Sequence, residues 1–245
     1  MGLLRELYRR YLIARHRPPH WQLRTGTIDR RIFRTVVVDN EYRLPDRFDA
    51  ADVLLDIGAH TGSFALAALR RGAGTVVCCE PDRDNFALLE DNLRPWTDRL
   101  RLRRAAVWRS DEPVASLCLH NPLDERNTGA NQVTADATAA SVPVAAFDAL
   151  VDELTADGRR LRLVKLDCEG AEWPILLTAR RLDRVDALCG EYHLGSLPPL
   201  FDVAGHTPYS PALLAHHLEA QGFAVTVEPL SRGVTPVGLF FAQRR

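Results

Sequence analysis

The sequence has few residues of several reactive kinds: five cysteines, one methionine and one lysine among 245 residues. The number of cysteines is odd and no two are spaced as Cys-x-x-Cys, which argues against a disulfide framework and against a zinc site. We therefore expect the reducing cytoplasm as its location. Lys165 is the only lysine beside 30 arginines, and we interpret this bias as a property of a GC-rich genome rather than of function.

The chain also lacks a long apolar run. A helix needs roughly 20 apolar residues to span a bilayer, and no segment approaches that length. The first residues, MGLLRELYRRYLIARHR, are interrupted by charges too early for a signal peptide. Glu6 stands where a myristoylation signal has Ser or Thr. We therefore predict no transmembrane segment.

Basic and acidic residues are nearly equal in number, 31 and 32. The net charge is −1 at pH 7, which gives no global argument for nucleic-acid binding. The first fifty residues nevertheless hold 11 arginines and 6 acids. A solvated basic face explains this most simply, and an anionic partner is the alternative. Hydrophobic residues make up 46% of the chain, enough for the core of one large domain, with or without an extension.

The N-terminal fifty residues differ in pattern from the rest. Apolar residues at helical spacing predict an amphipathic helix that ends before the prolines at 18 and 19. This helix either docks on the main domain or forms a lid, and a membrane-surface helix is an alternative with a short apolar stripe. Residues 34–45, RTVVVDNEYRLP, predict a lead-in strand and a turn. We therefore divide the chain into an N-terminal element, 1–50, and a main domain, 51–245.

From residue 52 the pattern alternates between apolar strands and helices. Strands are predicted at 53–57, 75–79, 100–107, 161–166 and 185–192, and two more close the chain. Residues 114–133 are irregular and can form a hairpin. The last helix has Ser210 as its cap, Pro211 in its first turn and Gly222 as its stop. This alternation predicts an α/β fold: a mostly parallel, seven-stranded Rossmann-like sheet with helices on both faces and an antiparallel edge.

The stretch VLLDIGAHTGSF, residues 53–64, runs from the first strand into a glycine turn. Gly58 and Gly62 are spaced as G-x-x-x-G, so the glycine that approaches the pyrophosphate in the dinucleotide fingerprint G-x-G-x-x-G is missing. In such sheets ligands bind beyond the carboxyl ends of the strands, where this turn lies. Small residues there let the backbone approach a ligand closely. The turn therefore predicts a ligand other than a dinucleotide.

Two acids accompany the turn. Asp56 precedes Gly58 by two residues, where it would face a pyrophosphate badly but suits a cationic amine. Glu80 closes the second strand, where a carboxylate can accept both hydroxyls of a ribose. Together they predict S-adenosylmethionine (SAM), with its amino-acid part over Gly58 and Asp56 and its ribose on Glu80. The alternative is a plain tight turn in an α/β protein.

Further blocks follow the glycine turn in a characteristic order: DIGAHTGSFALAAL, CCEPDRDNFALLEDNL, RRAAVW, LVKLDCEGAEWPIL and GEYH. Their order and spacing resemble the FkbM-type SAM-dependent methyltransferases over roughly residues 52 to 242. The resemblance implies a class I methyltransferase fold for the domain 51–245. It also implies methyl transfer to a hydroxyl oxygen, often on a sugar, glycolipid or polyketide-type natural product. Family members typically have Asn where this chain has His60.

The predicted SAM-binding residues come from the glycine turn, the end of the second strand and the loop after the third. Ala105 and Ala106 are expected to contact adenine through backbone and van der Waals contacts. The predicted set is Asp56, Gly58, Ala59, His60, Gly62, Ser63, Glu80, Pro81, Ala105, Ala106 and Asp167.

Polar residues also end the fourth and fifth strands: Asp167 and Glu169, then Glu191 and His193. Strand alternation places the members of each pair on related sides, so all four side chains can converge near the methyl group. A neutral alcohol is a poor nucleophile at pH 7, so O-methylation benefits from a general base or a divalent metal. His193 is the best base on intrinsic pKa, with Asp167 orienting either it or the substrate.

Each of these residues has an alternative role. Asp167, Glu191 and His193 can instead bind a divalent metal such as Mg²⁺, because hard carboxylates with one imidazole allow it. A hydrogen-bonded strand-end histidine is the structural alternative for His193. For Glu169 the alternative is a cap on the following helix. Cys168, between the two acids, is expected to pack into the core.

The irregular segment contains two weaker signals. Asn121-Pro122 resembles the Asn-Pro motif of amino-group methyltransferases, but that motif belongs at the end of the fourth strand, so we interpret it as a turn. In the FkbM-type family such a segment flanks the cofactor or acceptor pocket, which makes Asn127 and Gly129 further candidates.

We therefore predict a SAM-dependent O-methyltransferase acting on a small or lipid-linked hydroxylated molecule, with no nucleic-acid partner. Three alternatives are a NAD-type oxidoreductase, against which the G-x-x-x-G spacing argues, a non-catalytic SAM-binding module, and nucleic-acid methylation guided by the arginine-rich N-terminus. The sequence leaves the acceptor, the metal dependence and the oligomeric state open, with a homodimer as one option.

Overall fold

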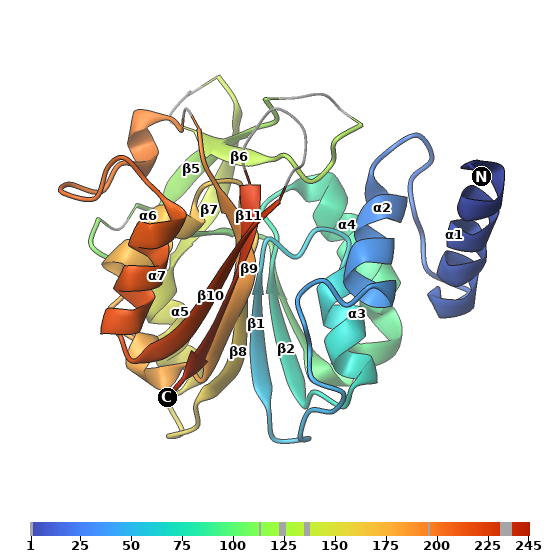
Figure 1. The fold of residues 1–245 in the computed structure, drawn as a ribbon, viewed down its shortest axis with the longest axis horizontal. Coiled ribbons are helices and arrows are strands. Elements are labelled where there is room, and N and C mark those ends of the chain that lie inside the picture. The colour runs from blue at the N-terminus through green and yellow to red at the C-terminus, as the bar shows by residue number, and fades with distance from the viewer. Residues whose placement is uncertain (1, 113, 123–125, 135–137, 196, 231–236) are drawn as a thin grey trace.

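The fold is built on a seven-stranded sheet flanked by helices (Figure 1). The computed structural model describes the whole chain except residues 1, 113, 123–125, 135–137, 196 and 231–236. The strand order is β10-β11-β9-β8-β1-β2-β3. The strands are β1 (Val53–Ile57), β2 (Thr75–Cys79), β3 (Leu100–Arg103), β8 (Leu161–Leu166), β9 (Ala187–His193), β10 (Phe223–Leu230) and β11 (Val237–Arg244). The predicted α/β fold and its antiparallel edge are confirmed, since β11 pairs antiparallel with both β9 and β10.

The central strands are apolar because helices cover both of their faces. All five residues of β1 are buried, as expected for a parallel strand between two layers. On one face lie α5 (Phe147–Leu154), α6 (Glu172–Thr178) and α7 (Pro211–Ala220), and on the other α3 (Ser63–Arg70) and α4 (Arg83–Leu93) (Figure 1). The chain winds from β1 to β2 on one side and reaches β8 on the other, so the strand order reverses at β1. A ligand site is expected at the carboxyl end of β1 for this reason.

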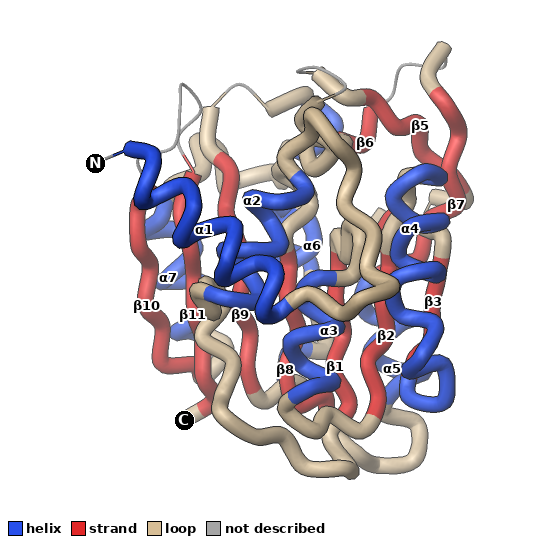
Figure 2. Tube along the Cα trace, turned by 90° about the vertical axis from the view of Figure 1, so that its right-hand side faces the viewer, coloured by secondary structure: helices blue, strands red, loops and turns tan. Residues whose placement is uncertain are grey.

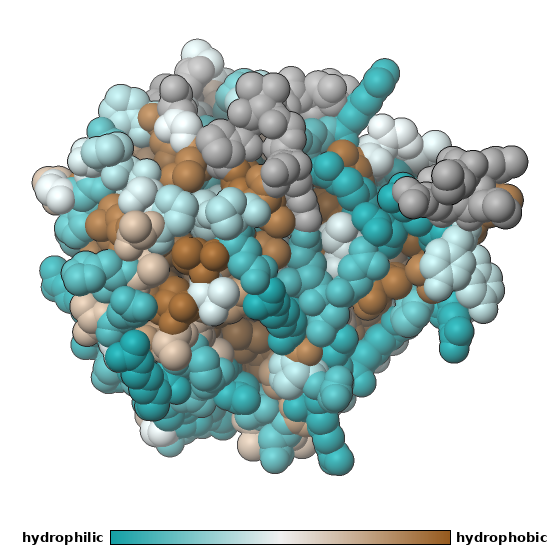
Figure 3. Space-filling view, viewed as in Figure 1, coloured by the Kyte–Doolittle hydropathy of each residue, from teal (hydrophilic) through white to brown (hydrophobic). Residues whose placement is uncertain are grey.

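Helix ends agree with their sequence signals. The Ser210 hydroxyl accepts a hydrogen bond from the Leu213 amide at 3.1 Å, and Pro211 begins α7, as predicted. Gly222 has φ +88, the left-handed conformation that stops a helix. Hydrophilic residues cover most of the face drawn in Figure 3, and apolar residues surface there only in separate patches, which is normal for a folded domain.

A second, four-stranded sheet has the order β4-β7-β5-β6. The predicted third strand, 100–107, is divided into β3 and β4 (Ala106–Trp108), and β4 leaves the main sheet to pair with β7 (Ala140–Ala146). The hairpin expected within 114–133 exists: β5 (Ser116–His120) pairs antiparallel with β6 (Gln132–Thr134). This hairpin lies above the carboxyl ends of the central strands (Figure 1).

The regular secondary structure of the N-terminal segment is helical. It forms α1 (Gly2–His16), α2 (Asp29–Phe33) and the π-helix η1 (Arg34–Val38). Helices α1 and α2 lie on the same side of the sheet as α3, and η1 contacts both α1 and α3 (Figures 1 and 2). The predicted amphipathic helix is confirmed as α1, but the predicted lead-in strand is wrong. Val36 and Val37 are buried in the same core as α3, so packing overrides the strand preference of a valine run.

Helix α1 is only partly buried. Ile13 is buried, whereas Leu7, Tyr8 and Tyr11 are among the exposed large hydrophobic residues. Arg70 of α3 donates to the His16 carbonyl and ties the end of α1 to the domain. Among the described residues, no helix is both long and apolar enough to cross a membrane.

Candidate functional site

A cavity of about 560 Å³ opens at the carboxyl ends of the central strands. Its wall combines the loop after β1, the end of β2, the ends of β8 and β9, the β5–β6 segment and the N-terminal helices. Nearly all of the predicted site residues line it: Gly58, Ala59, His60, Ser63, Glu80, Pro81, Ala105, Ala106, Asn127, Gly129, Asp167, Glu169, Glu191 and His193. The switch point of the sheet therefore gathers residues that lie up to 135 positions apart, from Gly58 to His193.

The loop after β1 depends on one glycine. Gly58 has φ +75, and a Cβ added there would lie 1.9 Å from the backbone oxygen of Asp167. The loops that follow β1 and β8 thus touch at this point, and only glycine fits between them. Gly62, with φ +95, instead packs against Leu89 and Leu93 of α4. Of the two glycines only Gly58 lines the cavity, so the cofactor contact of Gly62 stays a prediction beside this packing role.

A Gly58→Ala variant tests this packing. We expect a loss of several kcal/mol of unfolding free energy, since the left-handed φ alone costs about 1–2 kcal/mol and the carbonyl clash adds to it. Gly158 is the matched control, because it has φ +86 and nothing within 4 Å of an added Cβ. Denaturant unfolding should show a loss of only about 1 kcal/mol for Gly158→Ala. Equal losses in the two variants would contradict the contact.

Glu80 is buried with its carboxylate in the cavity wall. Its oxygens accept hydrogen bonds from the His60 amide at 2.7 Å and the Asp82 amide at 2.9 Å. Burial raises the pKa of Glu80 to about 7, against the lowering effect of these two bonds. The carboxylate is thereby fixed in one orientation and retains lone pairs that can accept ribose hydroxyls.

Asp56 is paired with the buried Lys165. Its carboxylate is fully buried, and Asp56 is absent from the described residues that line the cavity. Lys165 Nζ lies 3.2 Å from Asp56 Oδ1 and donates to the Gly58 carbonyl at 2.6 Å. Burial raises the pKa of Asp56, and the Lys165 charge opposes that rise. Among the protein groups the cation that Asp56 faces is Lys165, and its contact with the amine of a cofactor stays a prediction.

His60 belongs to a polar network that joins three parts of the chain. Its Nε2 lies 2.9 Å from the Thr128 hydroxyl and 3.3 Å from an Arg24 nitrogen. Thr128 and Arg24 both donate to the Asp29 carboxylate. Burial lowers the pKa of His60 to about 4, so the ring is neutral at pH 7. The network holds the N-terminal segment and the β5–β6 segment against the cofactor loop.

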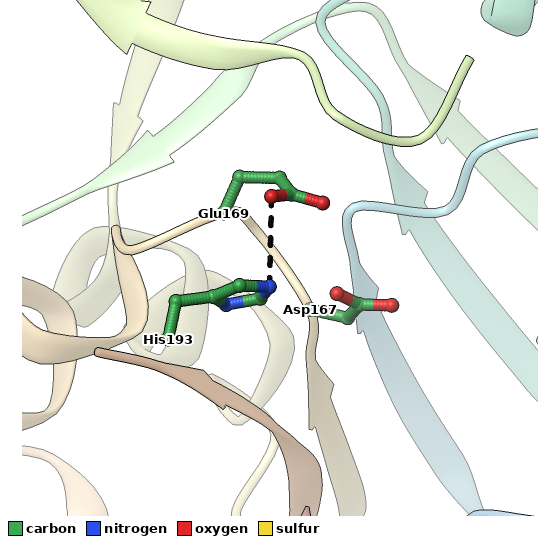
Figure 4. A group of neighbouring side chains, drawn as sticks. All are labelled: Asp167, Glu169 and His193. Atoms are coloured by element: carbon green, nitrogen blue, oxygen red, sulfur yellow. Dashed lines mark ion pairs between the residues drawn. The ribbon is translucent and has the colours of Figure 1, made fainter. Parts of the chain in front are cut away.

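Three side chains from the ends of β8 and β9 converge in the cavity (Figure 4). One ligand atom each from Asp167, Glu169 and His193 lies within 4.8 Å of the other two. His193 Nε2 is 3.5 Å from a Glu169 oxygen and 4.0 Å from a Glu191 oxygen. Tyr42 donates its hydroxyl to Asp167 Oδ2 at 2.8 Å, so Asp167 is oriented by the N-terminal segment rather than by His193.

Glu172 is the member of this site that sequence reasoning missed. It is buried at the start of α6, and its Oε1 accepts from the His193 amide at 2.7 Å and lies 3.0 Å from His193 Nδ1. Its Oε2 accepts from the Gly170 amide at 2.9 Å, which ties the start of α6 to the loop after β8. The available signal was the second acid in CEGAEW.

The role of His193 as a base stays a prediction, but its pKa in this environment differs from the intrinsic value. Burial lowers the pKa of His193, but the Glu172 and Glu169 charges outweigh it and hold the pKa well above its usual value. Burial raises the pKa of Glu169 to about 7, with His193 opposing.

The remaining candidates are placed as follows. Asn127 and Gly129 line the cavity, and Asn121 donates to the Asn127 carbonyl at 2.9 Å. Asn121 is not among the described residues that line the cavity, which agrees with its interpretation as part of a turn. Cys168 is half-buried and packs against one of the two hydrophobic cores, although it also lines the cavity.

The methyltransferase FkbM domain model matches residues 56–194, more than half of the chain. The chain belongs to the FkbM methyltransferase family. It is accordingly a SAM-dependent methyltransferase with the class I methyltransferase fold. No curated protein sequence matches the chain.

Solved structures of low sequence identity resemble this FkbM methyltransferase. One is a precorrin-6y C5,15-methyltransferase of Geobacter metallireducens GS-15, with TM-score 0.46 and 14% identity over 91% of this chain and 93% of that one. Another is the N-terminal domain of EvdMO1 with S-adenosylhomocysteine (SAH) bound, with TM-score 0.46 and 16% identity over 79% and 75%. An rRNA methylase of Streptococcus thermophilus has TM-score 0.43 and 12% identity over 87% and 92%. At this level of similarity the assignment rests on the family match.

The cavity of this FkbM chain fits SAM. Ser63 lines it, and the Ser63 hydroxyl is buried beside the cavity without a hydrogen-bond partner among the described residues. The Glu80 carboxylate offers acceptors to a ribose, and Ala105 and Ala106 provide small apolar contacts. SAM supplies an activated methyl group on a sulfonium, and the protein supplies position and electrostatics.

The raised pKa of Glu80 leads us to expect that cofactor affinity depends on pH. Hydrogen bonds to a charged acceptor contribute about 1.5–3 kcal/mol, so we expect Glu80→Gln to weaken SAH binding about 10- to 100-fold. Because the carboxyl is protonated below its pKa of about 7, wild-type affinity should fall as the pH drops through that value. Calorimetry with SAH from pH 6 to 8 checks this, with Glu80→Gln as the variant whose affinity stays flat. A slope that is the same in both proteins would contradict the role of Glu80.

Proposed function

We propose that this FkbM methyltransferase transfers the methyl group of SAM to a hydroxyl oxygen of a sugar, glycolipid or polyketide-type natural product. One observation carries the proposal: Asp167, Glu169 and His193 line the same cavity as Gly58, Ser63 and Glu80. An acceptor hydroxyl placed at the first group would therefore meet a methyl donor held by the second.

The reaction is an in-line displacement. The bond from sulfur to the methyl carbon breaks while the bond from the acceptor oxygen to that carbon forms, and SAH leaves with the sulfur electron pair. The hydroxyl proton passes to a nearby carboxylate or to water. Oxygen is favoured over nitrogen as the acceptor because β8 ends in KLDCEG rather than in an Asn-Pro motif, and because a cluster of acids suits the removal of a hydroxyl proton.

We further propose that residues 1–50 complete the methyltransferase domain 51–245 rather than act as a separate lid. Ile28, Ile32 and Val36 line the cavity, and Tyr42 reaches Asp167 from the same segment. These apolar side chains give a part of the wall that suits the hydrocarbon part of an acceptor, in the same cavity as the polar cluster. A hydroxylated acceptor with an apolar portion fits both.

The proposal is tested with SAM carrying a ¹³C methyl group and a panel of acceptors. The panel contains sugars, glycolipids and hydroxylated polyketides, with matched amines, carboxylic acids and RNA as the contrasting classes. We expect SAH release to accompany an O-methyl carbon signal in a member of the first group. Methyl transfer to an amine, a carboxylate or RNA, with all hydroxyl acceptors inert, would overturn the proposal.

A further inference from the structure

The cluster at the ends of β8 and β9 has the composition and spacing of a metal-binding site. Asp167 and Glu169 offer carboxylate oxygens and His193 offers an imidazole nitrogen, with the three ligand atoms within 4.8 Å of one another (Figure 4). Two hard oxygen ligands with one imidazole suit Mg²⁺ or Mn²⁺, which keep water or substrate oxygens in their other positions. The cavity in front of the cluster leaves room for such ligands.

The surroundings of His193 are those expected of a metal-binding histidine. His193 is 7% exposed, and its Nε2 lies toward Glu169 in the cavity without a hydrogen bond among the described residues. Its other ring nitrogen, Nδ1, faces Glu172, which is itself buried and anchored by two backbone amides. A carboxylate behind the second nitrogen fixes the tautomer and ring orientation of metal-bound histidines.

The carboxylates are also held from behind. The Tyr42 hydroxyl binds one oxygen of Asp167, so that side chain is oriented before any ligand arrives. Lys165 lies 4.0 Å from the same oxygen, but its charge is shared with Asp56 at 3.2 Å. The positive group nearest to Asp167 is thus already matched by another acid.

The charge balance calls for a cation. Asp167, Glu169, Glu172 and Glu191 bring four carboxylates around one imidazole. An acceptor hydroxyl that loses its proton before or during methyl transfer would be repelled as an alkoxide by this group. A divalent cation between the acceptor and the carboxylates reverses that repulsion.

We propose that Asp167, Glu169 and His193 hold one divalent cation, with Glu172 as the positioning residue for His193, and that this cation binds the acceptor hydroxyl. The second part rests on the proposed O-methyl transfer, whereas the metal site itself does not. The cation lowers the pKa of the hydroxyl that it binds, and the released proton passes to Glu191 or to water.

Binding of Mn²⁺ to the purified full-length protein tests the site without any acceptor. We expect electron paramagnetic resonance to show one bound Mn²⁺ per chain, displaced by excess Mg²⁺. Glu169→Gln should weaken binding at least 10-fold, and Glu172→Gln about 10- to 100-fold through the histidine. Asp157→Asn is the control, because Asp157 is an exposed acid paired with Arg159 on the surface and should leave binding unchanged.

Thermal unfolding of the variants separates lost ligands from lost structure. If a variant binds Mn²⁺ weakly but unfolds at the same midpoint temperature as the wild type, the result supports the site. No stoichiometric Mn²⁺ in the wild type, or equal affinity in Glu169→Gln, overturns it even if a methyl ether is formed. Conversely, bound Mn²⁺ together with methyl transfer only to an amine, a carboxylate or RNA supports the site and overturns the proposed function. O-methylation that survives a chelator, while Mn²⁺ binds, overturns the role of the cation in binding the hydroxyl.

Discussion

Asp167→Asn is expected to lower turnover by about 100- to 10,000-fold, because the carboxylate helps to hold the cation that acidifies the acceptor hydroxyl, and loss of such assistance to proton removal has effects of this size. The amide keeps the size of the side chain and can still accept the Tyr42 hydrogen bond of 2.8 Å. What it loses is the negative charge in the cavity. SAH affinity should therefore change less than 10-fold, and calorimetry beside a steady-state SAH-release assay separates the two effects.

Tyr42→Phe is the companion variant. It removes the hydroxyl that orients Asp167 but leaves the carboxylate in place, so we expect a loss of about 10-fold in kcat, smaller than that of Asp167→Asn. The variant that loses more turnover decides the interpretation. A larger loss in Tyr42→Phe, or turnover near wild type in Asp167→Asn, would remove Asp167 from the chemistry.

Lys165→Met is expected to destabilise the fold by about 3–5 kcal/mol, because it leaves the Asp56 carboxylate buried without its counter-charge. It also removes the donor to the Gly58 carbonyl beneath the cofactor loop. Burial raises the pKa of Asp56 above its unfolded value, so ionisation of this group opposes folding. The loss of unfolding free energy in Lys165→Met is therefore largest at high pH and becomes smaller as the pH falls through the folded-state pKa of Asp56. Urea unfolding at several pH values measures both effects.

The double variant Asp56→Asn/Lys165→Met provides the control. Replacing the stranded carboxylate by an amide removes the buried charge, so the double variant should be more stable than Lys165→Met alone. Its stability should also depend less on pH. If the double variant is less stable than Lys165→Met, the ion pair is not the reason for the loss.

The fold was predictable because its signals are local. Apolar runs of five residues, glycine stops and a serine cap each act within one element, and β1, β2, α7 and Gly222 agree with them. The cavity was predictable for a related reason. Carboxyl ends of adjacent parallel strands meet, so the residues after β1, β2, β8 and β9 lie together whatever the distance between them in sequence.

The corrected predictions all concern long-range contacts. The valine run at 36–37 resembles a strand until α3 packs against it. Lys165 was given no role from the sequence, yet it is buried and binds Asp56 and the Gly58 carbonyl, a pairing that no local pattern reveals. The pKa of His193 depends on Glu172, which lies 21 residues away and on another element.

The structure of the protein with SAH bound tests the central claim most directly: the donor site and the acid–histidine cluster share one cavity. We predict the SAH ribose on Glu80, adenine beside Ala105 and Ala106, and the sulfur turned toward Asp167, Glu169 and His193. SAH with its sulfur turned away from these three side chains would contradict the account. A protein that does not take up SAH but binds a nicotinamide nucleotide in this cavity would contradict it as well.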